Sequence, residues 1–246
     1  MVQARMRQEK LAAMGRVSAG IAHEIRNPLA AIVQANALLA EAPKTPQQQQ
    51  LTRMVAEHAE RLRRIVEDVM EVVPGPAPRV AALDATAQTA NICSEWARAG
   101  DWPLGADCQL QVDLPNEPLG VRFDGEHLRR VLVNLLDNAV LHGTGKAASI
   151  RLELLPANSH RALLRVVSDG APIPPEVERY LFEPFFSTRS RGTGLGLYIS
   201  RELCGRYGAS IEYRTRKEGA ERRNEFEISM QRQPLTAIDP RLHLNP

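Results

Sequence analysis

The sequence predicts a helical hairpin followed by a two-layer α+β sandwich. Three observations carry this prediction: two long heptad patterns in the first 73 residues, a proline-rich segment after them, and a mixture of helical and strand patterns beyond it. The strands and helices of the second part do not follow strict β-α-β alternation, which favours an α+β sandwich over a doubly wound parallel sheet.

Composition and charge exclude several classes of protein. The 246 residues carry a net charge of +2, which indicates neither a nucleic-acid partner nor an anionic membrane surface. No apolar run is long enough to cross a bilayer, and the amino terminus lacks a signal-peptide core. The three cysteines lack C-x-x-C spacing, so we expect reduced thiols, no metal framework and a cytoplasmic location.

The first heptad pattern predicts one helix from about residue 4 to residue 39, which Pro28 should bend or loosen just after His23 because it cannot donate to the carbonyl of residue 24. Its apolar positions, in steps of three and four, are Leu11, Met14, Ser18, Ile21, Ile25, Pro28, Ile32, Ala35 and Leu39. This register places His23 on the outward face, with Glu24 beside it and Asn27 one turn on. Such an imidazole is well placed to exchange a group with a second protein, although the stretch alone also fits a plain surface histidine.

The second heptad pattern predicts a helix that returns along the first after a turn at residues 43–46. Its apolar positions are Leu51, Val55, His58, Leu62, Ile65, Val69 and Val72. One partner helix covers this wide apolar face poorly, so we expect two hairpins to pair into a four-helix homodimer. We interpret His58 as structural, because no carboxylate accompanies it on its face.

The expected domains are a hairpin at 1–73, a linker at 74–79, a second domain at 80–232 and a loose tail at 233–246. Met1 leads directly into a helical pattern with no capping residue, so we expect the chain to be part of a longer protein. Within the second domain, helices are expected at 83–98, 124–142, 174–181 and 194–207. Strands are expected at 109–114, 119–123, 150–155, 162–167, 210–214 and 225–230. Asp124 is the expected amino-terminal cap of the second of these helices.

Two asparagines lie one turn apart on the helix at 124–142. Asn134 and Asn138 share one face, while Val131, Leu132, Leu135 and Leu136 supply the buried side. Asparagine is a poor helix former, so these amide oxygens suggest a hard cation such as Mg²⁺ with its phosphates. A solvated polar face is an equally good interpretation of this feature alone.

A glycine-rich segment, G-T-G-L-G-L at residues 192–197, opens the helix expected at 194–207. Glycines let the backbone approach a ligand, and the start of a helix offers N–H groups to phosphate. The spacing fits neither a dinucleotide fingerprint nor a P-loop. Before it, F-E-P-F-F at 182–186 anchors a polar segment as the hinge of a lid would, although packing alone also explains these phenylalanines.

Together these motifs resemble those of sensor histidine kinases. H-E-I-R-N-P-L at 23–29, N-L-L-D-N-A at 134–139, F-E-P-F-F at 182–186 and G-T-G-L-G-L at 192–197 resemble the H, N, F and G2 boxes, in order and in separation. The resemblance extends from about Arg7 to Met230. The stretches around the H and F boxes look most like the subgroup that controls nitrogen regulation and type IV pilus expression.

The resemblance implies a dimeric phosphotransfer bundle followed by an ATPase domain of the Bergerat or GHKL type. His23 would be the phosphoacceptor, Glu24 the general base, and Asn27 the residue that positions water for the reverse, phosphatase reaction. The amides of Asn138 and Asn134 would hold Mg²⁺ against the ATP phosphates. The glycine segment Gly192, Thr193, Gly194, Leu195 and Gly196 would shape the lid around ATP.

The resemblance also implies partners. A response regulator on a separate chain would receive the phosphoryl group, because no receiver-like acidic pocket followed by a lysine is visible in this sequence. Nucleic acid is not an expected partner. Contact with a membrane would come only through a sensor region outside this chain.

One motif departs from the family. The family's first glycine box reads roughly D-x-G-x-G-I, and its aspartate accepts a hydrogen bond from the adenine amino group. Aligned without a gap on Gly170, this chain has Ser168 in the aspartate's place and Asp169 one residue late. Either a bulge brings Asp169 into the pocket, or Ser168 accepts a weaker bond. The weaker bond would cost about 1.5–3 kcal/mol, or roughly ten- to a hundredfold in ATP affinity.

Two smaller departures accompany it: Pro172 replaces a glycine, and Leu141 stands where many relatives carry lysine. An alternative function follows, in which the chain binds nucleotide poorly and serves as a phosphatase or scaffold for a regulator. A third possibility, an ATPase of the gyrase and Hsp90 type, leaves the hairpin with His23 unexplained. The sequence therefore favours an ATP-dependent protein-histidine kinase.

Overall fold

The computed structural model describes residues 29–40, 45–71, 80–100, 109–188, 193–218 and 221–235. The chain divides into two compact units. The first contains the described residues up to 71 together with residues 193–195, and the second contains the rest of the described chain. The expected linker at 74–79 lies outside the described residues, so the expected domain borders stay predictions.

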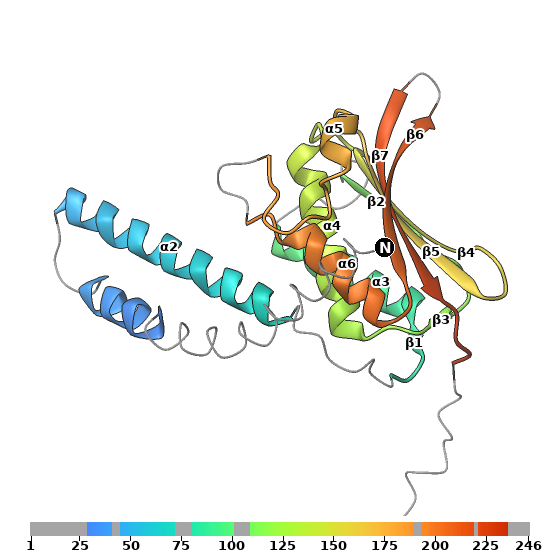
Figure 1. Ribbon diagram of the computed structural model, residues 1–246, viewed down its shortest axis with the longest axis horizontal. Coiled ribbons are helices and arrows are strands. Elements are labelled where there is room, and N and C mark those ends of the chain that lie inside the picture. Colours follow the sequence, from blue (N-terminus) through green and yellow to red (C-terminus); the bar gives the residue numbers. More distant parts are fainter. Residues whose placement is uncertain are drawn as a thin grey trace, which may run out of the picture. The chain divides into compact units, whose positions relative to one another are not determined.

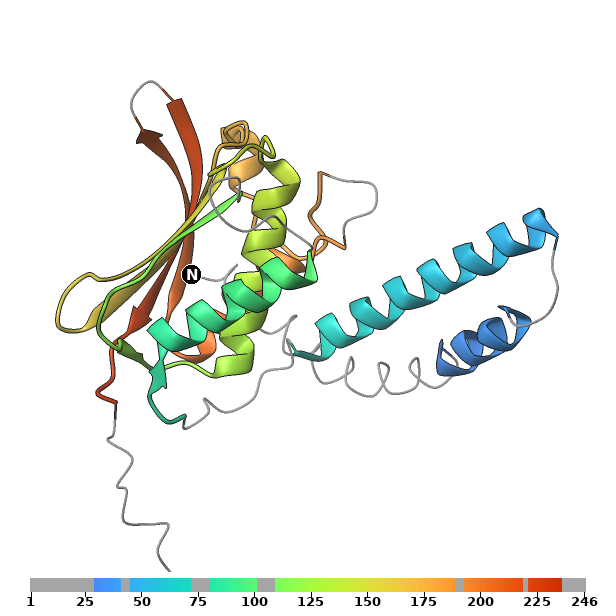
Figure 2. The same ribbon diagram turned by 180° about the vertical axis from the view of Figure 1, so that it is seen from behind.

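The first unit contains a helical hairpin, shown in blue and cyan in Figures 1 and 2. Residues 29–40 are helical, and α2 spans Pro46–Glu71. The start of α2 is a reciprocal cap, in which Gln48 N–H donates to Thr45 Oγ1 and Thr45 N–H donates to Gln48 Oε1. Asn36 Nδ2 donates to the Thr52 carbonyl at 2.9 Å and so ties the two helices together.

The first four positions of the predicted seam of α2, Leu51 to Leu62, are exposed in the single chain. Ala59 and Val66 are buried, but several large apolar side chains of the hairpin are exposed, namely Ile32, Val33, Leu38, Leu39, Leu51, Met54, Val55 and Leu62. His58, which we interpreted as a structural residue of this seam, is also exposed. The heptad therefore predicted the helix correctly, and many large apolar side chains are exposed in the described part of the hairpin.

The second unit is built on a five-stranded sheet in the order β2-β4-β5-β7-β6. The bounds are Leu110–Asp113 for β2, Ile150–Pro156 for β4, Arg161–Ser168 for β5, Ser210–Glu218 for β6 and Glu221–Gln231 for β7. β2 and β4 are parallel, and the other neighbours are antiparallel. A separate two-stranded sheet joins β1 (Leu83–Asp84) to β3 (Gly120–Val121).

Three helices cover one face of this sheet: α3 (Ala85–Ala99), α4 (Gly125–His142) and α6 (Gly196–Arg206) (Figures 1 and 2). A short helix, α5 (Pro175–Glu178), follows β5. The core lies between the helices and the sheet, and its fully buried members include Leu128, Leu132, Leu135, Leu136, Ile150, Leu152, Leu164, Leu203 and Ile228. This arrangement confirms the predicted two-layer α+β sandwich.

The helix starts follow their capping residues. Asp124 caps α4 as predicted, because its Oδ1 accepts from the N–H groups of Glu126 and His127, both at 3.0 Å. Asp84 caps α3 in the same way. The helix expected at 83–98 therefore begins two residues late: Leu83 and Asp84 pair with Val121 and Gly120 instead.

Other boundaries also differ from the expectation. The strand expected at 119–123 is reduced to β3, and α5 covers only part of the helix expected at 174–181. β6 and β7 run longer than 210–214 and 225–230, because polar residues at the ends of both strands continue the antiparallel pairing. Gln231 ends β7, and Gln233 N–H donates to the Gly120 carbonyl at 2.9 Å, so backbone hydrogen bonding continues to the first residue of the segment expected as a loose tail.

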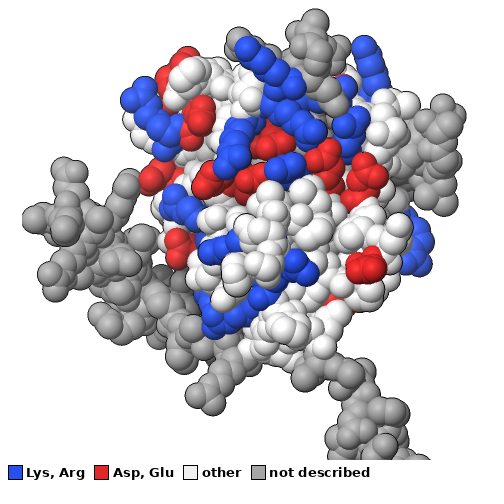
Figure 3. Space-filling model, turned by 90° about the vertical axis from the view of Figure 1, so that its right-hand side faces the viewer, with Lys and Arg blue, Asp and Glu red and all other residues white. Residues whose placement is uncertain are grey.

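The face of the sheet opposite the helices carries a lattice of charges, seen as interleaved blue and red in Figure 3. Arg165 Nε contacts Glu227 at 2.7 Å, and Arg216 contacts Glu153 at 3.0 Å. Glu225 and Glu227 are each only 7% exposed although they are charged. Arginines across neighbouring strands therefore cover these carboxylates, and charge replaces a second helical layer on this face.

Among the described helices, none combines the length and the apolar character needed to cross a membrane. Cys93 and Cys204 are free and buried, and Cys108 lies outside the described residues. Burial raises the pKa of both described thiols to about 12, so they stay neutral and unreactive near pH 7.

Candidate functional site

Four of the predicted site residues lie outside the described residues. They are His23, Glu24 and Asn27 of the first helix, and Gly192 of the glycine segment. Their roles stay predictions. The remaining predicted residues lie on α4, at the end of β5, and at the start of α6.

Asn134 links α4 to α6. Its Nδ2 donates to Ser200 Oγ at 2.9 Å, and Ser200 Oγ donates to the Gly196 carbonyl one turn earlier in α6, also at 2.9 Å. A Cβ atom at Gly196 would overlap Asn134 Oδ1, so only glycine permits this approach. Asn134 therefore has a structural task that its pairing with Asn138 in the sequence did not reveal.

Asn138, unlike Asn134, is not bonded to α6. It lies one turn beyond Asn134 and is half-buried, and its amide has no hydrogen-bond partner in the described part of the chain. The opposite side of α4 is buried through Leu132, Leu135 and Leu136, as predicted. The exposed face of α4 thus offers an uncommitted amide at Asn138, with Leu141 exposed one turn further on.

The glycine segment enters α6 as predicted. Gly194 has a positive φ of 67°, a conformation that favours glycine, and α6 begins at Gly196. Between them, Leu195 N–H donates to Thr193 Oγ1 at 3.4 Å. The expected stripe of Leu195, Ile199 and Leu203 is buried. The first N–H groups of α6 have no partners within the helix and are suited to an anion.

Ser168 ends β5 on the face that the helices cover. The strand pairs Ser168 with Ile150 on one side and with Asn224 on the other, so no bulge interrupts it here. Ser168 shares its face with Leu164 and Val166 and is 6% exposed, and its hydroxyl has no partner among the described residues. The strand register thus keeps Ser168 at the end of β5, with its side chain on the face that the helices cover.

Asp169, the next residue, is bonded to the segment that follows α4. Its carboxylate accepts from Thr144 N–H at 2.9 Å and from Thr144 Oγ1 at 2.5 Å, and it holds the segment that follows α4. Gly170 packs directly on the end of α4, where a Cβ atom would overlap the His142 carbonyl. The carboxylate of Asp169 is therefore bonded to Thr144, and the regular strand pairing shows no bulge that would turn it to the face of Ser168. The role of Ser168 toward adenine stays a prediction.

Two residues that the sequence analysis did not select hold the loop after β5. Asn224 Nδ2 donates to the carbonyls of Gly170 and Ala171, and Tyr213 O–H donates to Asn224 Oδ1 at 2.7 Å. Tyr213 Oη in turn accepts from Ile173 N–H at 3.1 Å. The sequence did contain a signal for Asn224. It alternates with the core residues Phe226 and Ile228 on the same face of β7, and a buried polar side chain at such a position needs a hydrogen-bond partner.

The aromatic segment at 182–186 has two parts. Phe182 packs edge-on against Phe226 with ring centroids 6.4 Å apart, and the Arg201 guanidinium lies 5.8 Å from the Phe182 ring centroid. Phe185 is 59% exposed and has a positive φ of 63°, which is rare for a bulky residue. Packing thus explains Phe182, whereas Phe185 lies outside the core.

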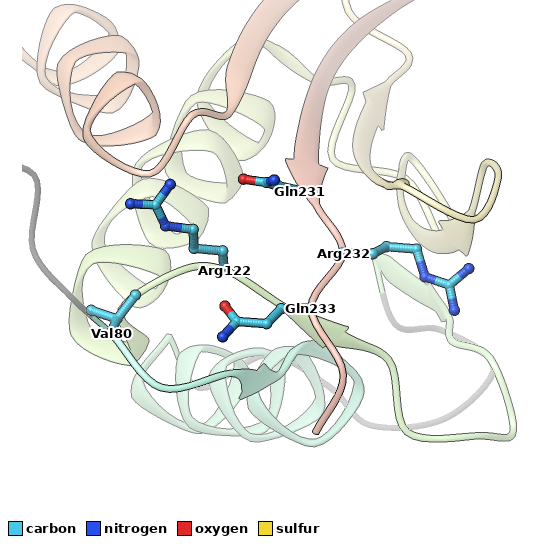
Figure 4. Close-up of a pocket in the computed structure, with 5 residues that line it drawn as sticks. All are labelled: Val80, Arg122, Gln231, Arg232 and Gln233. Atoms are coloured by element: carbon cyan, nitrogen blue, oxygen red, sulfur yellow. The ribbon is translucent and has the colours of Figure 1, made fainter. Parts of the chain in front are cut away.

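A pocket of about 350 Å³ lies at the opposite end of β7 from Asn224. Val80, Arg122, Gln231, Arg232 and Gln233 line it. In Figure 4 the side chains of Arg122, Gln231 and Gln233 lie on one side of the segment at the end of β7, and the side chain of Arg232 extends to the other side. Since Gln231 pairs with Arg161 at the start of β5 and Asn224 pairs with Ser168 at its end, this pocket contains none of the predicted site residues.

Two protein families match the chain. Residues 13–73 match the His Kinase A (phospho-acceptor) domain, and residues 123–234 match the histidine kinase-, DNA gyrase B-, and HSP90-like ATPase. The chain thus combines a domain of the phospho-acceptor class with an ATPase domain of the histidine kinase class. The chain has the two-domain core of a sensor histidine kinase.

Similar proteins agree with this assignment. The chain is 38% identical to the sensor protein kinase PilS of Pseudomonas aeruginosa PAO1, over 86% of this chain and 40% of PilS. It is 31% identical to the sensor histidine kinase ZraS of Salmonella typhi, over 87% of this chain and 46% of ZraS. The sensory histidine kinase/phosphatase NtrB of Salmonella typhimurium is 29% identical, over 86% of this chain and 63% of NtrB. The chain thus spans less than half the length of PilS and ZraS.

A solved structure supports the fold. Full-length ShkA in complex with AMPPNP matches with a TM-score of 0.68 at 21% identity, over 90% of this chain and 47% of ShkA. The catalytic domain of histidine kinase ThkA matches with a TM-score of 0.51 at 25% identity, over 63% of this chain and 96% of that domain.

Proposed function

We propose that this chain binds ATP and Mg²⁺, transfers the γ-phosphoryl group to His23, and passes it to an aspartate of a separate response regulator. The observation that carries the proposal is the presence in one chain of a phosphoacceptor match at 13–73, which includes the His23 motif, and an ATPase match at 123–234. The relatives named as sensor kinases are similar to this chain over 86% and 87% of its length.

The chemistry consists of two displacements. A ring nitrogen of neutral His23 attacks the γ-phosphorus, the bond to the β-phosphate oxygen breaks, and ADP leaves. Glu24 takes up the imidazole proton as general base. In the second step an aspartate oxygen of the regulator attacks the same phosphorus, and the bond to the His23 nitrogen breaks. Asn27 positions water in the phosphatase direction.

The residues on α4 fit a metal-bound nucleotide in one respect. Asn138 has an uncommitted amide whose oxygen suits a hard cation, whereas Asn134 is bonded to Ser200. We propose that Asn138 is the principal protein ligand and that Asn134 keeps the start of α6 in place beside it. When bound, Mg²⁺ would neutralise phosphate charge during transfer.

The test is incubation with γ-labelled ATP and Mg²⁺, followed by measurement of acid-labile label on the chain. We expect label on the native chain and none on His23→Gln. Addition of a purified receiver domain should remove the label. Label that persists on His23→Gln would contradict the phosphoacceptor role, and absence of label on a native chain that still binds ATP would contradict the kinase reaction.

Because Ser168 stands where the family carries an aspartate, we expect the chain to bind ATP with modest affinity. Its hydroxyl replaces a carboxylate as acceptor, so Ser168→Asp should tighten ATP binding by roughly ten- to a hundredfold. Calorimetric titration of both chains with ATP and Mg²⁺ measures this change. Equal affinities would show that the nucleotide does not reach Ser168.

We also propose that the chain is a homodimer through its hairpin. The exposed apolar residues of α2 include Leu51, Val55 and Leu62, which lie along one heptad seam. Sedimentation should show a dimer for the native chain and a monomer for Leu51→Glu with Leu62→Glu. Gln49→Glu, an exposed polar position on the same helix, is the matched control and should stay dimeric.

A further inference from the structure

The segment that joins β5 to α5 has no regular secondary structure, yet it is firmly held. Residues 170–173 form neither helix nor strand. The carbonyls of Gly170 and Ala171 accept from Asn224 Nδ2 at 3.1 and 3.0 Å. The N–H of Ile173 donates to Tyr213 Oη at 3.1 Å. Three backbone groups of this four-residue loop are thus bonded to two side chains.

The two side chains depend on the loop in return. Asn224 is 4% exposed and Tyr213 is 7% exposed, and the Tyr213 hydroxyl donates to Asn224 Oδ1 at 2.7 Å. A buried amide is costly unless each of its polar atoms has a partner. Asn224 uses both of its N–H groups on the loop and its oxygen on Tyr213. We call this pair of side chains the Asn224–Tyr213 clamp. Its hydrogen bonds are therefore all formed only when the loop has this one conformation.

The clamp lies directly beside Ser168. Asn224 is the cross-strand partner of Ser168, and the loop begins two residues after it. On its other side the loop is fixed against α4, because Gly170 packs on the His142 carbonyl and Asp169 bonds Thr144. Any ligand that reaches Ser168 therefore meets a loop whose position is set by Asn224 and Tyr213.

We propose that Asn224 and Tyr213 are positioning residues, which hold loop 170–173 in the conformation that accepts the nucleotide base. This inference rests on the proposed function, because it needs the nucleotide to bind beside Ser168. Neither side chain takes part in phosphoryl transfer. Loss of the clamp should therefore weaken ATP binding and leave the transfer step intact.

The first test is Tyr213→Phe, which removes the hydroxyl and keeps the ring. Losing the bonds to Ile173 and Asn224 should raise the KM for ATP by about five- to tenfold, while the labelling rate at saturating ATP stays within about twofold. Amide hydrogen exchange of residues 171–173 should accelerate. Tyr207→Phe is the matched control: Tyr207 is also buried, and its hydroxyl bonds His127 Nδ1 at 2.5 Å, away from this loop.

The second test is Asn224→Asp, which keeps the shape of the side chain. A carboxylate would face the Gly170 and Ala171 carbonyls in place of an N–H donor, so ATP binding at pH 8 should weaken by more than about tenfold. Protonation restores one donor, so the ratio of native to variant affinity should shrink as the pH falls toward 5.5.

The outcomes separate the two proposals. If the native chain does not bind ATP, the proposed function fails and this inference fails with it. If the native chain binds ATP but Tyr213→Phe changes neither the KM nor the exchange of residues 171–173, only the inference is overturned. Equal increases in KM for Tyr213→Phe and Tyr207→Phe would also overturn it, because they would reflect general loss of stability.

Discussion

Asn134 of α4 and Ser200 of α6 share a hydrogen bond of 2.9 Å between Nδ2 and Oγ. This bond joins the helix that carries the asparagine motif to the helix that the glycine segment opens. Gly196 makes the approach possible because it presents no Cβ atom to Asn134 Oδ1. The two motifs are therefore parts of one packed interface, and the glycine at 196 has a steric role in addition to any role toward phosphate.

Gly196→Ala should damage this interface. The added Cβ overlaps the Asn134 amide, so either the asparagine or the start of α6 must move, at a cost of about 1–3 kcal/mol in the free energy of unfolding. Urea unfolding measures the loss, and ATP titration should show weaker binding in the same variant. Gly205→Ala is the matched control on the same helix, because a Cβ there meets nothing within 4 Å. It should stabilise the chain by up to about 1 kcal/mol. Equal effects at both positions would contradict the steric explanation.

Asp169→Ala should loosen the segment after α4. The variant loses two hydrogen bonds from Thr144, and we expect the free energy of unfolding to fall by about 1–3 kcal/mol. Thr144→Val removes only the hydroxyl bond and should cost about half as much. Urea unfolding of the three chains gives the ranking. An Asp169→Ala variant that keeps its stability but binds ATP more than tenfold more weakly would show that Asp169 contacts the nucleotide directly.

Glu227→Gln should weaken the charged face of the sheet. The Glu227 side chain is 8% exposed and contacts Arg165 at 2.7 Å and Arg214 at 3.4 Å, so the change leaves two arginines without their shared counter-charge. We expect a loss of about 1–3 kcal/mol. Glu212→Gln is the matched control: it also pairs with Arg214, but its side chain is 57% exposed, so it should change stability by less than about 0.5 kcal/mol. Thermal unfolding of both variants checks this, and a larger effect at Glu212 would contradict the role of burial.

The sequence predicted the elements whose signals are local. The heptad predicted α2, and the α4 pattern with Asp124 predicted that helix and its cap, because periodicity and capping depend on neighbours in the chain. Boundaries set by pairing partners were predicted less well. Leu83 and Asp84 fit a helix by their own pattern, and only the distant segment Gly120–Val121 turns them into a strand.

In the candidate site, too, the sequence predicted local features and missed those that depend on distant partners. Motif spacing selected Asn134, Asn138 and Ser168, but it gave the two asparagines one shared task, whereas Asn134 is bonded to Ser200. That bond joins residues 66 positions apart, and no local pattern encodes it. Asn224 was missed for a related reason: its importance comes from the loop it holds, which precedes it by more than 50 residues.

Stability should decline in alkaline solution through the buried thiols. Burial raises the pKa of Cys204 from 9.0 to about 12 in the folded chain. Between these values the unfolded chain binds fewer protons than the folded one, so the free energy of unfolding falls as the pH rises, by up to about 1.4 kcal/mol per pH unit for each such thiol. Cys93, whose pKa burial also raises to about 12, adds to the slope. Below pH 8 both thiols are protonated in either state and contribute no slope.

Urea midpoints measured from pH 7 to pH 10.5 test this prediction. Cys204→Ala is the comparison: it should be less stable at pH 7 but should lose stability less steeply above pH 9. Parallel slopes for the native chain and Cys204→Ala would show that this thiol stays protonated in both states or ionises equally in both.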